Sequence, residues 1–193
     1  MTMKSLNLLV ALCLMGLTTT ISLASSETVD LGPAKVSLDL ASAGAYTVKN
    51  GESSELEHNH DSKISDFQYS IYSATVTFEG TSNQVMIEVH KMSASEPLDK
   101  QISKKRTISV LEHCIEQSDM KSRRADYDTK SYTIDGHEGI LVTVDTREKN
   151  PLYIAAYSPD EEDGSGSIIC IVGSNFPWET SKSILDSVNT QLA

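Results

Sequence analysis

Beyond its first two dozen residues the sequence has no long apolar run. A transmembrane helix needs about 20 consecutive apolar residues, so we expect no membrane span in the remainder of the chain. Basic residues are also scarce: 16 Lys and Arg stand against 27 Asp and Glu, which gives a formal net charge of −11. Nucleic acids and anionic membranes attract clustered positive charge, so neither is an expected partner.

The common catalytic motifs are missing as well. The chain contains no Gly-x-Ser-x-Gly elbow, no His-Glu-x-x-His zinc helix and no glycine-rich phosphate loop. These absences disfavour an enzyme, but a catalytic site that is assembled in space from distant residues leaves no such motif. A hydrolase with a spatially assembled site therefore stays open as an alternative.

What the sequence does have is the pattern of a cleavable secretory signal peptide in residues 1–24. Lys4 precedes an apolar run from Leu6 to Leu17, and the small residues Ser22 and Ala24 suit cleavage after Ala24. We therefore expect a secreted or extracytoplasmic protein in which residues 25–193 form a single domain. Without cleavage, the same domain would be tethered to the outer face of the membrane.

The expected mature chain has two cysteines, Cys114 and Cys170. Disulfides persist outside the reducing cytosol, so a bond between these two residues is one alternative. Such a bond would stabilise the fold by about 4 kcal/mol in the chain-entropy model. The other alternative is a pair of buried free thiols that pack as small apolar groups.

Alternating apolar and polar residues predict a mainly antiparallel sheet. Asp135-Gly136 suits a tight hairpin turn, because both residues tolerate positive φ. Residues 80–83 separate another pair of strands, whereas residues 50–63 are polar and predict an exposed loop. The predicted strands lie at residues 36–40, 46–48, 67–78, 85–89, 131–134, 140–144, 152–157 and 168–172.

Two amphipathic segments predict helices. One runs from about Lys105 to Gln117, and the other begins at Pro177. Their apolar stripes contain Ile108, Leu111 and Ile115 in the first, and Ile184, Leu185, Val188 and Leu192 in the second. Because strand 168–172 is apolar on both faces, we expect helices on both sides of the sheet. The predicted fold class is α+β, an α-β-α sandwich around a mainly antiparallel sheet.

Two short motifs resemble the Mog1/PsbP-like superfamily. They are the turn at residues 132–139, which leads into a strand, and the ending Phe176-Pro177-Trp178-Glu179 followed by residues 184–188. The resemblance extends from about Val36 to Leu192. It implies the same α-β-α sandwich and a non-enzymatic role, although proteins of one fold serve unrelated functions.

The most suggestive cluster for a metal is His58-Asn59-His60-Asp61. Imidazole and carboxylate are ordinary ligands of zinc and copper. His58, His60 and Asp61 would need a further ligand from elsewhere, for which His90 and His137 are candidates. A divalent-metal module is therefore an alternative to the interpretation of this stretch as a flexible polar loop.

Other charged or aromatic features have structural interpretations. Residues 160–163 form an acidic hairpin tip whose spacing does not match an EF-hand loop. The basic clusters at residues 104–106 and 121–124 are typical of a solvated helix face and loop. Trp178, the only tryptophan, is predicted to cover the core where the last helix docks, with a role as an interface anchor as the alternative.

Together these observations favour an exported, non-catalytic binding or accessory domain. Its expected partner is a protein of the cell envelope or the extracellular space. No cofactor is predicted for this role.

Overall fold

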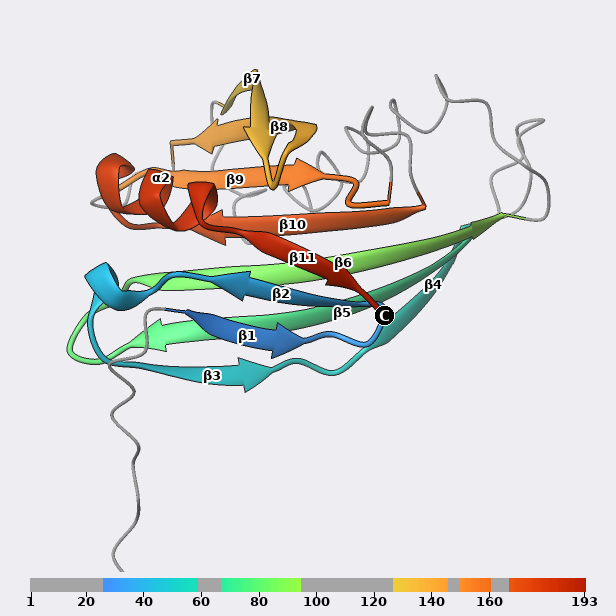
Figure 1. Cartoon of the computed structure of the whole chain (residues 1–193), viewed down its shortest axis with the longest axis horizontal. Coiled ribbons are helices and arrows are strands. Elements are labelled where there is room, and N and C mark those ends of the chain that lie inside the picture. Colours follow the sequence, from blue (N-terminus) through green and yellow to red (C-terminus); the bar gives the residue numbers. More distant parts are fainter. Residues whose placement is uncertain (1–25, 59–66, 95–126, 146–149, 161–166) are drawn as a thin grey trace, which may run out of the picture.

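The computed structural model describes residues 26–58, 67–94, 127–145, 150–160 and 167–193 (Figure 1). The signal peptide and the helix predicted at Lys105–Gln117 lie outside these residues. Within them the chain forms two antiparallel sheets, a 3-10 turn at Ala41–Ala43 and one α-helix, α2 (Trp178–Asp186). No helix in the described part is long and apolar enough to cross a membrane.

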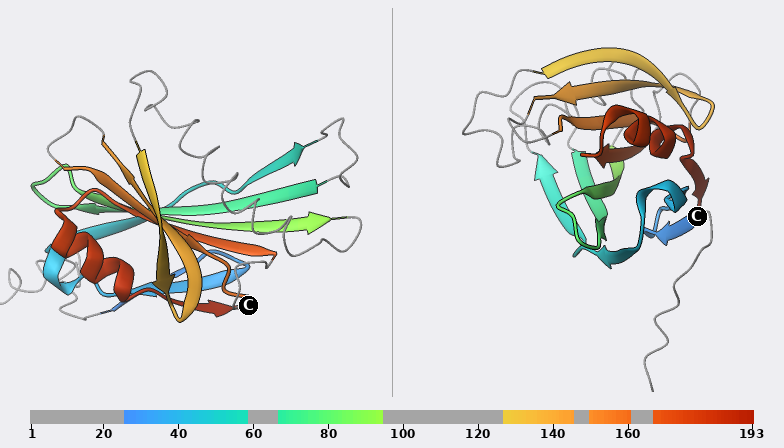
Figure 2. Two further views of the ribbon diagram at one scale, coloured as in Figure 1. Left: turned by 90° about the horizontal axis from the view of Figure 1, so that it is seen from above. Right: turned by 90° about the vertical axis from the view of Figure 1, so that its left-hand side faces the viewer.

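The larger sheet has eight strands, and all of its pairs are antiparallel. Its order is β3-β5-β6-β10-β9-β8-β7, and β4 also pairs with β5. Figure 2 shows the strands fanning round from β5 to β7, as the twist of a sheet requires. The strands are β3 (Tyr46–Asn50), β4 (Ser54–His58), β5 (Phe67–Phe78), β6 (Gln84–Ala94), β7 (Tyr127–Ile134), β8 (His137–Val144), β9 (Leu152–Tyr157) and β10 (Ile168–Ser174).

The hairpins predicted from turn residues are confirmed. Ile134 pairs with His137 across Asp135-Gly136, whose φ angles are +53° and +81°. Two consecutive positive φ angles match a type I′ turn, which suits the twist of the flanking strands. The hairpins of β5 with β6 and of β9 with β10 also form.

The prediction of an exposed loop over residues 50–63 is wrong for residues 54–58, which form β4. Asn50 at the end of β3 pairs with Ala74, and Ser54 at the start of β4 pairs with Ile71. Three residues on this edge therefore face two on β5, which is a β-bulge. Gly51 makes the bulge compact: its N–H donates to the Ser73 carbonyl at 2.8 Å, and a Cβ there would lie 2.2 Å from Ser73 Oγ.

A small sheet joins the two ends of the described chain. Its order is β1 (Glu27–Asp30), β2 (Ala34–Leu38) and β11 (Asn189–Leu192). The prediction that the last helix continues to Leu192 is therefore wrong. The helix ends at Asp186, the N–H of Ser187 bonds to the Ile184 carbonyl, and Thr190 pairs with Val36 of β2.

The predicted α-β-α sandwich with helices on both faces is wrong. The layer that packs on the large sheet is itself mostly a sheet, and Figure 2 shows it on the same side as α2. Val29 of β1 and the alternating Ala34, Val36 and Leu38 of β2 are buried, so one face of the small sheet closes the core. Large buried side chains between the layers include Leu38, Leu40, Ile87, Leu141, Tyr157, Ile184 and Leu185.

Strand β10 is buried on both faces, as its sequence predicts. Cys170 and Val172 belong to the core between the sheets, whereas Ile169 and Ile171 belong to a second apolar cluster on the opposite face. Apolar residues on both faces thus predicted burial correctly. They did not determine whether a helix or a strand provides the covering layer.

Candidate functional site

Of the predicted metal ligands His58, His60 and Asp61, the described residues include His58 alone. His58 is the last residue of β4 and pairs with Phe67, while His60 and Asp61 lie outside the described residues. No group of three His, Cys, Asp or Glu side chains that could hold a metal occurs among the residues described.

The two histidines considered as further ligands are in different surroundings. His90 is buried on β6, and its Nε2 lies 2.8 Å from Oε2 of Glu88. The ring of His137, at the start of β8, lies 5.8 Å from that of Tyr157. His90 thus contacts a neighbour on its own strand, whereas His137 packs against β9.

Cys170 is a buried free thiol, and Cys114 lies outside the described residues. Burial raises the pKa of Cys170 to about 12, although hydrogen bonds with Thr190 and Tyr157 oppose this shift. A reactive cysteine needs a low pKa and access to solvent. Cys170 is thus a structural residue in this fold, and the geometry gives it no role as a nucleophile.

A polar network surrounds the Tyr157 hydroxyl beside Cys170. This hydroxyl shares a hydrogen bond with Thr190 Oγ1 and lies 3.4 Å from a carboxylate oxygen of Asp135. Asp135 also accepts hydrogen bonds from the Thr190 N–H at 2.6 Å and from Asn189 Nδ2 at 2.9 Å. The network satisfies buried polar groups and holds β11 against the large sheet.

Side chains from three elements converge at the start of α2. The Trp178 ring packs on the core, and its centroid lies 5.0 Å from that of Tyr153 on β9. The ammonium of Lys130 on β7 lies over the same ring, 5.1 Å from its centroid. This distance is within the range of a cation–π interaction. The prediction that Trp178 covers the core is confirmed.

A second contact between β7 and α2 lies at the other end of the helix. The Tyr132 hydroxyl donates to Asp186, which also forms an ion pair with Lys182. Partial burial opposes ionisation of Asp186, but the bonds from Lys182 and Tyr132 outweigh it and lower its pKa. Burial and the bond to Asp186 both raise the pKa of Tyr132. The site therefore favours a neutral phenol beside an ionised carboxylate.

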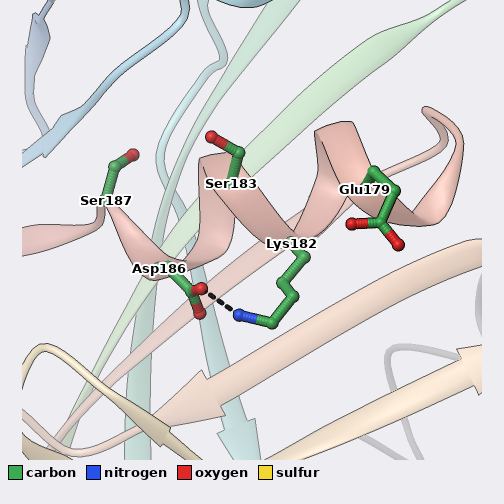
Figure 3. A pocket seen from close by; sticks show the side chains of 5 residues that line it. All are labelled: Glu179, Lys182, Ser183, Asp186 and Ser187. Atoms are coloured by element: carbon green, nitrogen blue, oxygen red, sulfur yellow. Dashed lines mark hydrogen bonds and ion pairs between the residues drawn. The ribbon is translucent and has the colours of Figure 1, made fainter.

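The exposed side of α2 forms a shallow, open hollow of about 410 Å³ (Figure 3). It is lined by Glu179, Lys182, Ser183, Asp186 and Ser187. We call these residues, together with Lys130, Tyr132 and Trp178, the α2 face. Its carboxylates, ammonium groups and hydroxyls offer both donors and acceptors to a ligand.

Of the α2 face, sequence reasoning singled out only Trp178 as a candidate for recognition. Lys130 and Tyr132 lie two residues apart on a mostly polar strand. That pattern does not indicate a helix beside them. The signal that was available is the two-residue period of a strand. Residues two apart share a face, so Lys130 and Tyr132 lie on the same face as Ile134, which is buried in the core.

Of the remaining charged clusters, the described residues include only Asp160. Asp160 accepts hydrogen bonds from the N–H and hydroxyl of Ser167 at 2.7 and 2.9 Å, which closes the base of the acidic hairpin tip. Residues 161–163 and both basic clusters lie outside the described residues. Asp160 thus has a structural role in its turn.

No family model, no curated protein and no solved structure matches this chain. The resemblance to the Mog1/PsbP-like superfamily rests on the short motifs alone.

Proposed function

We propose that this chain is an exported binding or accessory domain that recognises a protein of the cell envelope or extracellular space through the α2 face. The observation that carries the proposal is the arrangement of Lys130 and Tyr132 against the two ends of α2. Side chains that are fixed before binding lose little conformational entropy in a complex.

The composition of the α2 face supports recognition of a protein. Tryptophan and tyrosine are enriched among the residues that contribute most to protein interfaces. Around them lie Glu179, which makes no hydrogen bond or ion pair within the described part of the chain, and the Lys182–Asp186 pair. Charged groups at the edge of an interface favour encounter with a partner of complementary charge.

Photo-crosslinking in the native host tests this function. A photoreactive amino acid replaces Ser183 on the α2 face or, as a control, Thr47 on β3, which is also exposed. We expect Ser183 to yield a discrete adduct that Thr47 does not yield, and Glu179→Lys to reduce its amount. Equal adducts from both positions, or none from either, would exclude the α2 face as the binding site.

Export is tested separately by the N-terminus of the secreted protein. Cleavage after Ala24 predicts a mature chain that begins at Ser25, which intact-mass measurement of the extracytoplasmic fraction detects. Full-length protein confined to the cytoplasm would contradict export.

A further inference from the structure

Strand β7 is the regular edge of the large sheet. All eight of its residues pair with β8 without interruption, and no other strand of the described chain pairs with it. The opposite edge is divided into β3 and β4 by the bulge at Gly51–Ser53. An uninterrupted edge strand offers a row of backbone donors and acceptors to another strand.

The turn determines which backbone groups face outward. A two-residue hairpin turn closes on a hydrogen-bonded pair, here Ile134 with His137. Hydrogen-bonded pairs alternate along an antiparallel ladder, so Lys130 and Asp128 also bond to β8. The N–H and carbonyl groups of Thr129 and Ser131 consequently point away from β8.

Contacts with α2 fix the shape of this edge. Lys130 lies over Trp178, Tyr132 donates to Asp186, and Ile134 is buried. A lysine on an edge strand commonly discourages pairing with another chain. The ammonium of Lys130 is instead drawn toward an aromatic ring on the face of the sheet, so the outer edge itself stays accessible.

We propose that β7 pairs antiparallel with β7 of a second copy of this chain, with Thr129 on the two-fold axis. Only alternate residues direct their backbone N–H and carbonyl groups outward. A symmetric pairing must therefore place odd-numbered residues opposite odd-numbered ones and even-numbered residues opposite even-numbered ones. With Thr129 on the axis, Asp128 of each copy lies opposite Lys130 of the other. These pairs are not hydrogen-bonded, and side chains approach closely at such positions.

Neighbouring registers are less complementary. An axis at Lys130 places two lysines opposite each other, which is unfavourable for like charges. An axis at Ser131 places the Asp128 carboxylate opposite Ile134, whose side chain is buried. Asp128 is exposed and has no hydrogen bond or ion pair in the described part of the chain, so its charge is free to pair with the second copy.

The pairing extends the large sheet across two copies. A two-fold axis perpendicular to the sheet leaves both α2 helices on the same side, so the two α2 faces would act together. Thr129 lies outside the α2 face, so Thr129→Pro tests dimerisation without changing a residue of that face, and the two proposals fail separately.

Sedimentation of the mature protein over a range of concentrations tests the dimer. We expect a concentration-dependent dimer for the unchanged chain and for Thr129→Val, and a monomer for Thr129→Pro. Proline removes an outward N–H without taking a bond from β8. A monomer at all concentrations, or a dimer unaffected in Thr129→Pro, would overturn the proposal; circular dichroism verifies that the variant is folded.

Charge reversal tests the register. Asp128→Lys alone and Lys130→Asp alone create like-charge pairs, and each should weaken the dimer on the order of tenfold. When the two variants are mixed, every such pair becomes opposite in charge, so we expect a one-to-one heterodimer. Salt should reduce these differences. Single variants that associate as well as the unchanged chain would exclude this register.

Discussion

The carboxylate of Asp135 accepts a hydrogen bond from the backbone N–H of Thr190 at 2.6 Å, although the two residues are 55 positions apart. The second carboxylate oxygen accepts from Asn189 Nδ2 at 2.9 Å. Asp135 belongs to the turn between β7 and β8, and Thr190 to β11. Asp135 thus adopts the positive φ that its turn requires, and its side chain joins the large sheet to the small one.

Asp135→Asn tests this connection. Asparagine tolerates the positive φ of the turn, so the hairpin should persist. The amide group, however, presents a donor where the carboxylate accepted a bond. Hydrogen bonds to charged groups contribute roughly 1.5–3 kcal/mol, so we expect the free energy of unfolding in urea to fall by about 2 kcal/mol.

Asp128→Asn is the matched control, because it removes the same charge from an exposed position of the same hairpin. Its effect on the unfolding free energy of the monomer should stay within about 0.5 kcal/mol. Equal losses in the two variants would show that Asp135 does not connect the sheets.

Ser181 anchors α2 to β10. Its hydroxyl donates to the Phe176 carbonyl at 2.9 Å and lies 2.9 Å from the Ser174 hydroxyl, and both serines are buried. Ser181→Ala leaves buried polar groups without a partner, which costs about 1–3 kcal/mol. We expect urea denaturation to show a loss of this size, and Ser183→Ala, on the exposed side of the same helix, to show almost none. A similar loss in both would contradict the anchor.

Much of the large sheet was predictable because its signals are local. The hairpin turn at Asp135-Gly136 depends on two adjacent residues, and the apolar runs of β9 and β10 consist of neighbours in the chain. The apolar run from Ile168 to Val172 also predicted that β10 is buried on both faces. None of these features requires knowledge of a distant segment.

The features that were missed depend on distant partners. Val188 and Leu192 continue the apolar spacing of α2, so the sequence favours a helix where β11 forms. As a strand, β11 gains the hydrogen bond from Thr190 to Asp135 and the ladder with β2. No local sequence pattern indicates these two interactions. The α2 face was missed for the same reason, since Lys130 and Tyr132 gain their roles only when α2 packs beside β7.

Alkaline pH should destabilise the fold. Burial and a hydrogen bond to Glu27 raise the pKa of Tyr46 from 10.0 to about 12. The pKa values of Tyr132 and Tyr157 are raised as well, chiefly by burial. A raised pKa in the folded state means that the stabilisation is complete below pH 10 and is lost as the pH rises toward the folded-state values.

The measurement is the free energy of unfolding in urea at successive pH values, together with the phenolate absorbance. We expect a decline that begins near pH 10, the ordinary pKa of these groups, and is less steep in Tyr132→Phe. Tyr72→Phe is the control, because the Tyr72 hydroxyl makes no hydrogen bond in the described part of the chain. An unchanged slope in Tyr132→Phe would contradict the role of the Tyr132–Asp186 bond.

Alkylation of Cys170 distinguishes a buried thiol from a disulfide. With a pKa of about 12, only on the order of one thiol in ten thousand is ionised at about pH 8, and burial blocks access as well. In the folded mature protein we therefore expect no labelling of Cys170 by iodoacetamide, as judged by peptide mass spectrometry. In urea without reductant, the free thiol should label fully. A Cys114–Cys170 disulfide would instead require reductant before either residue is labelled, and labelling of Cys170 in the folded protein at the rate seen in urea would show that the thiol is not buried.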